Sequence, residues 1–311
     1  MHVRASDAQQ QASSLGLLQQ SYEQLSTGTF SGSISSLTAG DITVFRETLD
    51  QSVFQTGISD SRHITIAAAC ELSGQAYWNG RYICPDSLVA FTPGREFELR
   101  TPTHAVCVGI SMAPTLLQSL EPDRPPGYWE KLFARQDCWL EVGRWQFDLR
   151  SRIAGLLNSA SEAGAESDCI AELVELRELT IDYLGGVVAR GDSGGQKLRA
   201  DSYPRIARRA RAAMLDRLGE PLSVTDLCTE LGCSRRSLQY AFESIYDLSP
   251  VAYLRTLRLA AARRQLTSGR RGTTVQDVAA AVGFNHLPRF AQEYSRMFGE
   301  RPSESLARHR A

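Results

Sequence analysis

The sequence predicts a multidomain α+β protein, with a β-rich N-terminal domain followed by helices and then an all-α domain. The all-α domain is expected to hold two helix-turn-helix units joined by a long helix. Three observations support this prediction. One helical pattern is written twice between residues 223 and 299, residues 30–112 have the spacing of short β-strands, and the charge divides unevenly along the chain. A length of 311 residues allows two domains, each with its own core.

The composition is that of a globular protein, with 42% apolar and 22% charged residues. No run of 18 apolar residues occurs, so we expect no membrane partner. Residues 1–14 lack an apolar segment and are expected to be a disordered leader rather than a secretory signal. The seven cysteines are odd in number and none are paired as C-x-x-C, which favours buried thiols in the cytoplasm over disulfides or a zinc site.

The net charge of −1 conceals a division of the chain into an acidic part and a basic part. From Arg199 onward there are 19 Arg, no Lys and 11 Asp or Glu, a net charge of +8, which leaves −9 for the remainder. A basic domain beside an acidic one is typical of a protein in which only the basic domain meets DNA. We therefore expect double-stranded DNA as a partner and a cytoplasmic, nucleoid-associated location.

Residues 15–189 are expected to form one domain, beginning with β-strands. FSGSISSLT and DITVFRETL are separated by Ala39-Gly40, and Asn79-Gly80 with aromatic neighbours predicts a type I′ hairpin. A sandwich or barrel of such strands can enclose a small ligand. The aromatic side chains here are expected mainly in the core, with a pocket lining as the alternative: Phe45, Phe54, Tyr77, Trp78 and Phe91.

The pattern becomes helical from Ala113, where apolar residues recur every four positions: Trp145, Leu149, Ile153 and Leu157. The segment 166–189 predicts either a dimerising helix pair or helices that pack on their own β domain. Residues 190–198 include RGDSGGQ, a composition typical of a flexible linker. The second domain is therefore expected to span residues 199–311.

The two helical units correspond residue by residue. Asp226, Leu227 and Gly232 match Asp277, Val278 and Gly283, each 51 positions later, and Leu238, Phe242 and Pro250 match Phe290, Tyr294 and Pro302, each 52 later. In the first unit Ser223 and Asp226 have the spacing of a capping box, Gly232 supplies the turn, and Ser234 can cap the next helix. In the second unit Thr274 or Thr273 is expected to cap the first helix, and Gly283 is expected to supply the turn between the two helices.

The second helix of each unit has a polar outer face, because its apolar residues take the inner one. The fork of an Arg matches the O6 and N7 atoms of guanine, and Gln matches adenine. The residues expected to contact DNA are Ser234, Arg235, Arg236, Gln239, Tyr240, His286, Arg289, Gln292 and Arg296. The alternatives are that such arginines only add solubility and that His286 only shapes the helix entry.

Between the units, Ser249 is expected to cap and Gly269 to end a helix of about 17 residues, about 25 Å long. A rod of that length can hold two recognition helices in successive major grooves about 34 Å apart.

These residues resemble the AraC/XylS family of transcription regulators. The connecting helix carries the family pattern RLxxAxxxL from Arg258 to Leu266, and the second unit carries Gly283-Phe284, Phe290, Tyr294, Phe298-Gly299 and Pro302. The resemblance covers about the last 110 residues, and members often have Arg where Gln292 stands. The ethanolamine-operon type of regulator is more similar still in SRRSLQYAF, GFNHLPRFAQEY and FGERPSESL, although that branch tends to have Trp at Asn285.

The resemblance implies a regulator, usually an activator, whose N-terminal domain senses a small-molecule effector and controls engagement of DNA or RNA polymerase. Ethanolamine, or another small amine or alcohol, is the implied effector, with the pocket residues unknown. A homodimer is also expected. One alternative is control by a protein partner that docks on the helices of residues 113–189.

An enzyme fused to a DNA-binding domain is the remaining alternative, and the sequence argues against it. No G-x-S-x-G, G-x-G-x-x-G or P-loop occurs, and no carboxylate cluster or H-x-H joins His63 and His104. The cysteine spacings do not match the four-cysteine zinc site of DNA-repair methyltransferases with a similar domain. We therefore expect no catalytic residues, no metal and no cofactor.

Overall fold

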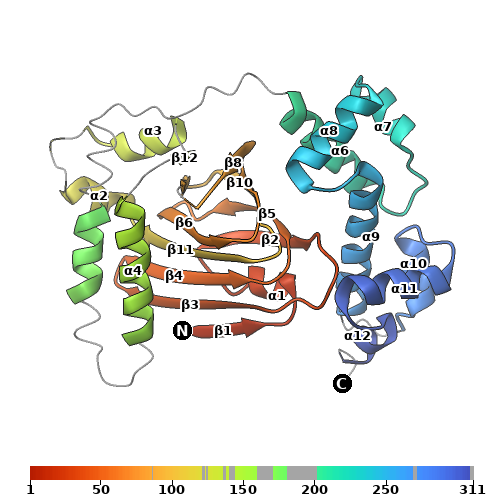
Figure 1. Ribbon diagram of the computed structural model, residues 1–311, viewed down its shortest axis with the longest axis horizontal. Coiled ribbons are helices and arrows are strands. Elements are labelled where there is room, and N and C mark those ends of the chain that lie inside the picture. The colour runs from red at the N-terminus through yellow and green to blue at the C-terminus, as the bar shows by residue number, and fades with distance from the viewer. Residues whose placement is uncertain are drawn as a thin grey trace. The chain divides into compact units, whose positions relative to one another are not determined.

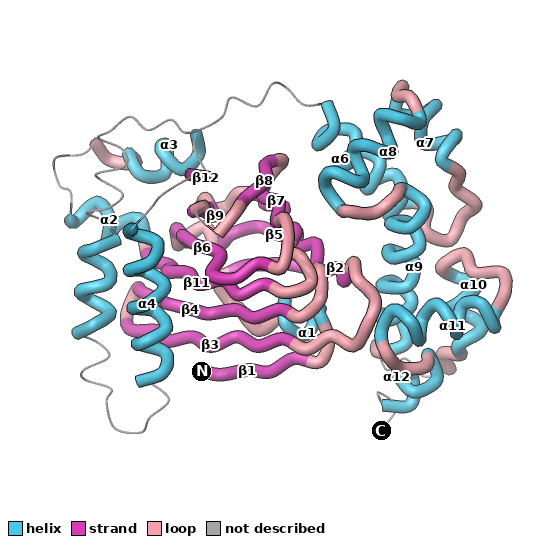
Figure 2. Tube along the Cα trace, viewed as in Figure 1, coloured by secondary structure: helices cyan, strands magenta, loops and turns pink. Residues whose placement is uncertain are grey.

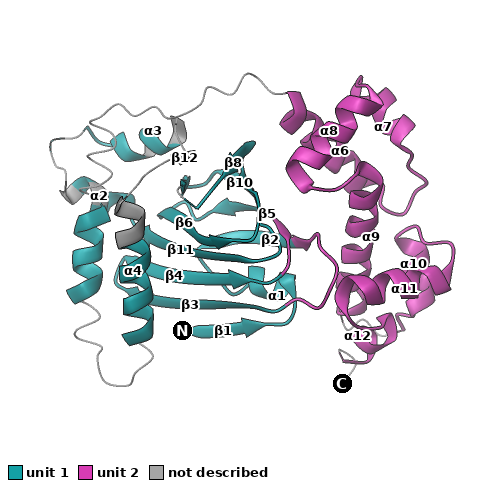
Figure 3. Ribbon diagram, in the orientation of Figure 1, with its two compact units in different colours: residues 1–22, 31–50, 55–198 teal, residues 23–30, 51–54, 199–311 magenta. Residues whose placement is uncertain are grey.

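The computed structural model describes residues 1–308 except 86, 121–122, 124, 136–137, 140–143, 160–170, 181–201 and 269–271. The chain divides into two compact units (Figure 3). The first comprises residues 1–22, 31–50 and 55–198, and the second comprises 23–30, 51–54 and 199–311. The linker predicted at 190–198 lies outside the described residues. Two short upstream segments therefore belong to the same unit as the C-terminal helices.

The first unit contains two antiparallel sheets. The larger one has seven strands in the order β1-β3-β4-β11-β6-β9-β12, and the smaller has five in the order β2-β5-β10-β7-β8. The larger sheet consists of β1 His2–Ala5, β3 Gly32–Ala39, β4 Ile42–Leu49, β11 Ala105–Met112, β6 Ile64–Leu72, β9 Leu88–Phe91 and β12 Cys138–Trp139. The smaller consists of β2 Leu18–Gln24, β5 Val53–Ser59, β10 Glu96–Arg100, β7 Ala76–Trp78 and β8 Arg81–Ile83.

The larger sheet is covered on both faces, which explains why the sequence of β6, ITIAAAC, is apolar at every position except Thr65. Side chains alternate between the faces of a strand, so Ala67 packs among residues of both sheets while Ile66 and Ala68 point the other way. The core between the sheets includes Trp78 and Phe91. On the outer face, the strands pack against helices.

The helices of the first unit are α1 Ala8–Ala12, α2 Pro114–Leu120, α3 Tyr128–Arg135 and α4 Arg144–Ser159, and residues 171–180 are also helical. Figure 1 shows α4 lying beside β3 and β4, with Leu149 and Ile153 buried against the sheet. Leu173 and Leu176 are buried in the same cluster. The part of the 166–189 segment that the structure describes therefore packs on its own β domain, which was one of the two alternatives.

The predicted hairpin is confirmed, because Asn79 and Gly80 join β7 to β8 with φ of 42° and 93°. The expectation of a disordered leader over residues 1–14 is wrong. His2–Ala5 pairs with β3, and Asp7 caps α1 by accepting hydrogen bonds from the backbone of Gln9 and Gln10. The leader lacks an apolar run because a short edge strand and one helical turn need few apolar residues.

The second unit is helical and is organised around α9 Pro250–Leu266 (Figure 2). Its other helices are α6 Ser202–Asp216, α7 Val224–Leu231, α8 Arg235–Tyr246, α10 Val275–Ala281, α11 Leu287–Phe298 and α12 Pro302–Arg308. The first half of α9 packs against α8 through Tyr253 and Phe242. The second half, from Leu259 to Leu266, shares a core with α10, α11 and α12. The predicted rod of 17 residues is confirmed.

Candidate nucleic-acid interface

The first helix-turn-helix unit is built from α7 and α8. Ser223 forms a capping box with Asp226: the Asp226 backbone N–H donates to Ser223 Oγ at 3.2 Å, and the Ser223 N–H donates to Asp226 Oδ2 at 2.9 Å. Hydrogen bonds from Ser223 lower the pKa of the Asp226 carboxyl. Gly232 then ends α7 in the left-handed region, with φ of 62°, so that α8 leaves at an angle.

Ser234 accepts a hydrogen bond from the backbone N–H of Ser237 at 3.0 Å and caps α8. Leu238 and Phe242 are completely buried on the inner face of the helix. The sequence prediction named Ser234 both as a cap and as a DNA contact, and the structure shows the capping contact.

The outer face of α8 carries the other residues of the first helix-turn-helix motif that are predicted to contact DNA. Arg235 Nη2 donates to Thr225 Oγ1 at 2.6 Å, and Arg236 Nη2 donates to the Tyr240 hydroxyl at 3.0 Å, with its guanidinium 5.3 Å from the Tyr240 ring. Gln239 Nε2 donates to Glu243 Oε1 at 2.6 Å. Hydrogen bonds between exposed side chains contribute little free energy, so these donors can be redirected to a ligand at small cost.

The second unit is built from α10 and α11. Thr274 caps α10 by accepting from the backbone N–H of Asp277 at 3.1 Å. His286 caps α11, because its Nδ1 atom accepts a hydrogen bond from the backbone N–H of Arg289 at 3.2 Å. His286 thus shapes the entry of α11, and its Nε2 atom is the one left to meet a ligand, so the prediction of a DNA contact at His286 stays a prediction.

On the outer face of α11, the residues of the second helix-turn-helix motif that are predicted to contact DNA surround a shallow hollow. The hollow is lined by His286, Pro288, Arg289, Gln292, Glu293 and Arg296. Arg289 Nε lies 2.8 Å from Glu293 Oε1, and Arg255 of α9 lies 3.2 Å from Glu293 Oε2. Glu293 thus holds two arginines at the edge of this face. Gln292 and Arg296 are exposed.

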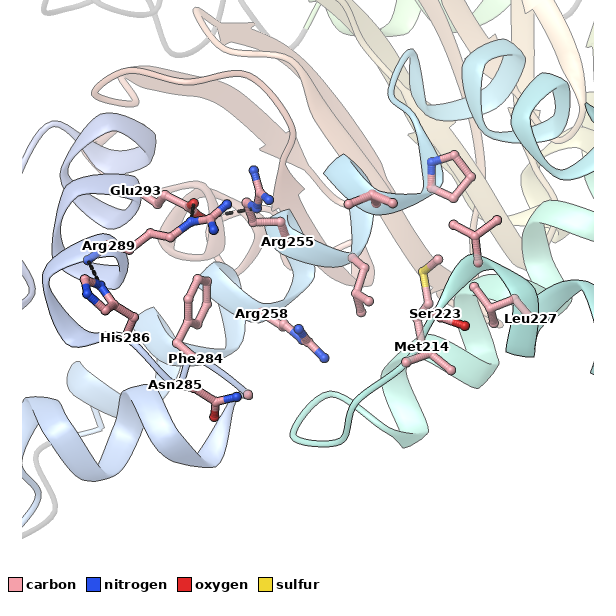
Figure 4. A pocket seen from close by; sticks show the side chains of 16 residues that line it. Met214, Ser223, Leu227, Arg255, Arg258, Phe284, Asn285, His286, Arg289 and Glu293 are labelled. Atoms are coloured by element: carbon pink, nitrogen blue, oxygen red, sulfur yellow. Dashed lines mark hydrogen bonds and ion pairs between the residues drawn. The ribbon is translucent and has the colours of Figure 1, made fainter. Parts of the chain in front are cut away.

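A groove of about 490 Å³ lies within the second unit, between its two helix-turn-helix motifs along α9 (Figure 4). The first motif contributes Ser223 and Leu227, and the second motif contributes His286 and Arg289. Arg258 also lines the groove, but its Nε donates to the backbone oxygen of Leu218 at 2.9 Å and its Nη2 to that of Glu220 at 2.6 Å. Arg258 therefore holds the loop between α6 and α7.

A buried ionic cluster in the second unit has no counterpart in the sequence predictions. Glu23 Oε1 lies 2.5 Å from Arg211 Nη2, and Glu23 Oε2 accepts from the Tyr253 hydroxyl at 2.9 Å. Phe54 packs edge-on against Tyr246 at 4.9 Å between ring centroids. This cluster occupies the guanidinium of Arg211, which lies on α6.

The described residues contain no group of three or more His, Cys, Asp or Glu placed to hold a metal ion. His63 lies 3.3 Å from Asp60, which also pairs with Arg62, and His104 lies 3.2 Å from Glu71. None of the helices in the described part of the chain combines the length and the apolar character that a membrane span requires.

The second unit is thus a DNA-binding domain of the helix-turn-helix class. Residues 227–308 match the family model described as "Helix-turn-helix domain". The probable thc operon regulatory protein of Rhodococcus erythropolis is 35% identical over 106 residues, which cover 34% of this chain and 32% of that protein. XylDLEGF operon transcriptional activator 2 of Pseudomonas putida is 37% identical over 78 residues, 25% of this chain and 50% of that protein.

A solved structure, that of a probable AraC family transcriptional regulator from Rhodopseudomonas palustris, is 34% identical and covers 34% of this chain and 99% of that one, with a TM-score of 0.33. In sequence, this helix-turn-helix domain is similar to domains of transcription regulators, one of them described as a probable AraC family regulator. The chain spans about a third to a half of the length of the two curated relatives.

Proposed function

We propose that this chain is a sequence-specific DNA-binding transcription regulator whose two helix-turn-helix units read successive major grooves. The observation that carries this proposal is the pair of polar helix faces, on α8 and α11, attached to the two halves of one rigid helix. The 17 residues of α9 give a rod about 25 Å long, and successive major grooves on one side of DNA are about 34 Å apart. Recognition helices on the two halves of the rod can reach both grooves.

The two reading faces differ, which favours an asymmetric DNA site. The first offers Arg235, Arg236 and Gln239, whereas the second offers Arg289 and Gln292 beside a histidine cap. Arg selects guanine and Gln selects adenine in the major groove. A single chain would therefore read two different half-sites, without the need for a palindrome.

The test is a gel shift of the full chain on DNA upstream of neighbouring genes, with Arg235→Ala and Arg289→Ala. Each substitution is expected to cost about 1–3 kcal/mol at the specific site and to relax the choice of base there. Arg62→Ala is the matched control, since Arg62 is an exposed arginine of the first unit. A loss of affinity that is equal on every DNA sequence would make the two residues phosphate contacts and contradict base reading.

We propose further that the protein is an activator that works with RNA polymerase in the cytoplasm and responds to a small-molecule effector. The relatives in Pseudomonas putida named as transcriptional activators support the first point. The cavity within the first unit supports the second, with ethanolamine or another small amine or alcohol as the effector. Thermal shift of the full chain against a panel of such compounds tests the proposal. A shift with none of them, together with capture of a protein on the helices of residues 113–189, would favour the protein-partner alternative.

A homodimer is also proposed. Val174 and Leu179, on the helix of residues 171–180, are large apolar side chains that are more than a third exposed. Analytical ultracentrifugation of the full chain and of Val174→Ser tests this role. A monomer at micromolar concentration would rule it out.

A further inference from the structure

The space between the two sheets of the first unit contains a cavity of about 40 Å³. By volume, it holds about three atoms of the size of a water oxygen. Most of its lining is apolar, with Ala67, Ala69 and Ala76 leaving room where larger residues would fill it. The polar residues on its walls are Gln20, Tyr22, Glu47, Ser87, Thr101 and Cys107, together with Gln55.

The carboxylate of Glu47 is the chemical centre of this cavity. Glu47 is only 6% exposed, and its Oε1 atom accepts hydrogen bonds from Gln11 Nε2 and from the Tyr22 hydroxyl, each at 2.9 Å. Gly32 makes the first of these contacts possible, because a Cβ there would lie 2.0 Å from the Gln11 amide oxygen. Helix α1, which the sequence did not predict, supplies Gln11.

Glu47 forms no ion pair with any residue that the structure describes, and no Lys or Arg lines the cavity. Both of its hydrogen bonds are accepted by Oε1, so Oε2 is the oxygen left for a further donor. Burial raises the pKa of the Glu47 carboxyl, against the lowering effect of the bonds from Gln11 and Tyr22. A buried carboxylate without a cation costs free energy, and a cationic partner relieves that cost.

A second polar group on the cavity wall also lacks a partner. Gln55 is 2% exposed, and its Nε2 atom donates no hydrogen bond to any described residue. An unpaired buried amide is as unfavourable as a lost hydrogen bond, so the site is incomplete on the donor side as well. A ligand that donates to Glu47 and accepts from Gln55 would satisfy both groups.

We infer that this cavity is a binding site for a small primary ammonium ion, held by the Glu47 carboxylate and completed by an acceptor atom that faces Gln55. The inference rests on the proposed effector-responsive function, narrows the ligand class to a primary ammonium ion and adds the residues that hold it. The size of the cavity limits the ligand to about three or four non-hydrogen atoms, unless the walls move.

The test measures thermal unfolding of the full chain with ethylammonium, ethanol and formate, three probes of equal heavy-atom count that differ in charge. Concentrations run to about 20 mM at constant pH and ionic strength, since ligands this small bind weakly. Ethylammonium is expected to raise the Tm, whereas ethanol and formate leave it unchanged. 2-Hydroxyethylammonium, which adds an acceptor oxygen, is expected to act at a lower concentration than ethylammonium.

Glu47→Gln is the decisive variant, because it keeps the shape of the side chain and removes the charge. It is expected to weaken ethylammonium binding by about 10- to 100-fold, the usual range for a charge-assisted hydrogen bond. Glu71→Gln, which removes an exposed carboxylate of the same unit, is the control and should bind like the parent. Ala69→Leu, which fills the cavity, should lose the response by a second route.

Three results would overturn the inference: a Tm rise with ethanol equal to that with ethylammonium, a rise with formate, or no rise with either amine. A response to amines that persists in Glu47→Gln would move the site elsewhere. The gel shift separates this outcome from the proposed function. A chain that binds promoter DNA but ignores amines refutes only the cavity, and a chain that binds amines but no DNA refutes only the regulator.

Discussion

The buried cluster around Glu23 makes a quantitative prediction about the second unit. Glu23 is 5% exposed and satisfies both the Arg211 guanidinium and the Tyr253 hydroxyl. Glu23→Ala would leave the Arg211 guanidinium without its carboxylate, with only the Tyr253 hydroxyl 3.0 Å from its Nε atom, and would leave that hydroxyl without the acceptor it donates to. Breaking a buried ion pair by removing one partner costs about 3–5 kcal/mol. The second unit should therefore lose about that much stability, or two to four powers of ten in its opening equilibrium.

Hydrogen exchange of the backbone amides in α6 and α9 measures this loss of stability, because Arg211 and Tyr253 lie on those helices. Exchange there should be faster in Glu23→Ala than in the parent chain. Glu220→Ala, an exposed carboxylate of the same unit, is the control and should leave exchange unchanged. Glu23→Leu combined with Arg211→Met and Tyr253→Phe should recover most of the loss, since an apolar replacement leaves no unpaired group. The reasoning is refuted if Glu23→Ala stays within about 1 kcal/mol of the parent chain and matches the control.

Other expectations can be tested more briefly. Gly283→Ala should destabilise the chain more than Gly232→Ala in urea unfolding, because both have positive φ but only at Gly283 would the Cβ crowd neighbouring atoms, at 3.1 Å; equal losses would contradict this. Hydrogen bonds from Arg62 lower the pKa of Asp60 to about 2, so its stabilising contribution is present above pH 4 and lost as the pH falls towards 2. An NMR titration in which Arg62→Ala fails to raise that pKa would be a contrary result. A fragment of residues 199–311 should shift promoter DNA, and complete absence of binding would show that both reading units need the rest of the chain.

The sequence predicted the helix-turn-helix units well, because their signals are local. Ser223 and Asp226 are three residues apart, the glycine turns need only one residue, and the apolar side chains recur within one helical turn. The start of α9 could also be predicted from local signals, since Ser249 caps the helix and Pro250 is its first residue. Gly269, which was expected to end it, lies outside the described residues, and the helix ends at Leu266.

The signals that failed were long-range or weakly apolar. Glu23 and Arg211 are 188 positions apart, and the sequence around neither residue predicts that the two form an ion pair. Helix α1 was missed because AQQQA offers no apolar period, although Asp7 in front of it is a recognisable cap. The roles of the aromatic residues could not be predicted from composition: Phe45, Trp78 and Phe91 share one core, Phe45 and Phe91 also line the cavity, and Phe54 belongs to the second unit.

The inclusion of residues 23–30 and 51–54 in the second unit has a consequence for synthesis on the ribosome. At about 5–20 residues per second, Arg211 is added about 10–40 s after Glu23, given their separation of 188 positions. During that interval residues 23–30 and 51–54 lack the C-terminal helices against which they pack. Glu23 can then form hydrogen bonds only with solvent or with residues already synthesised. The strands of the first unit can pair in the meantime. The unit that carries the recognition helices is therefore completed late in translation, because it combines residues 23–30 and 51–54, which are synthesised early, with residues 199–311, which are synthesised last.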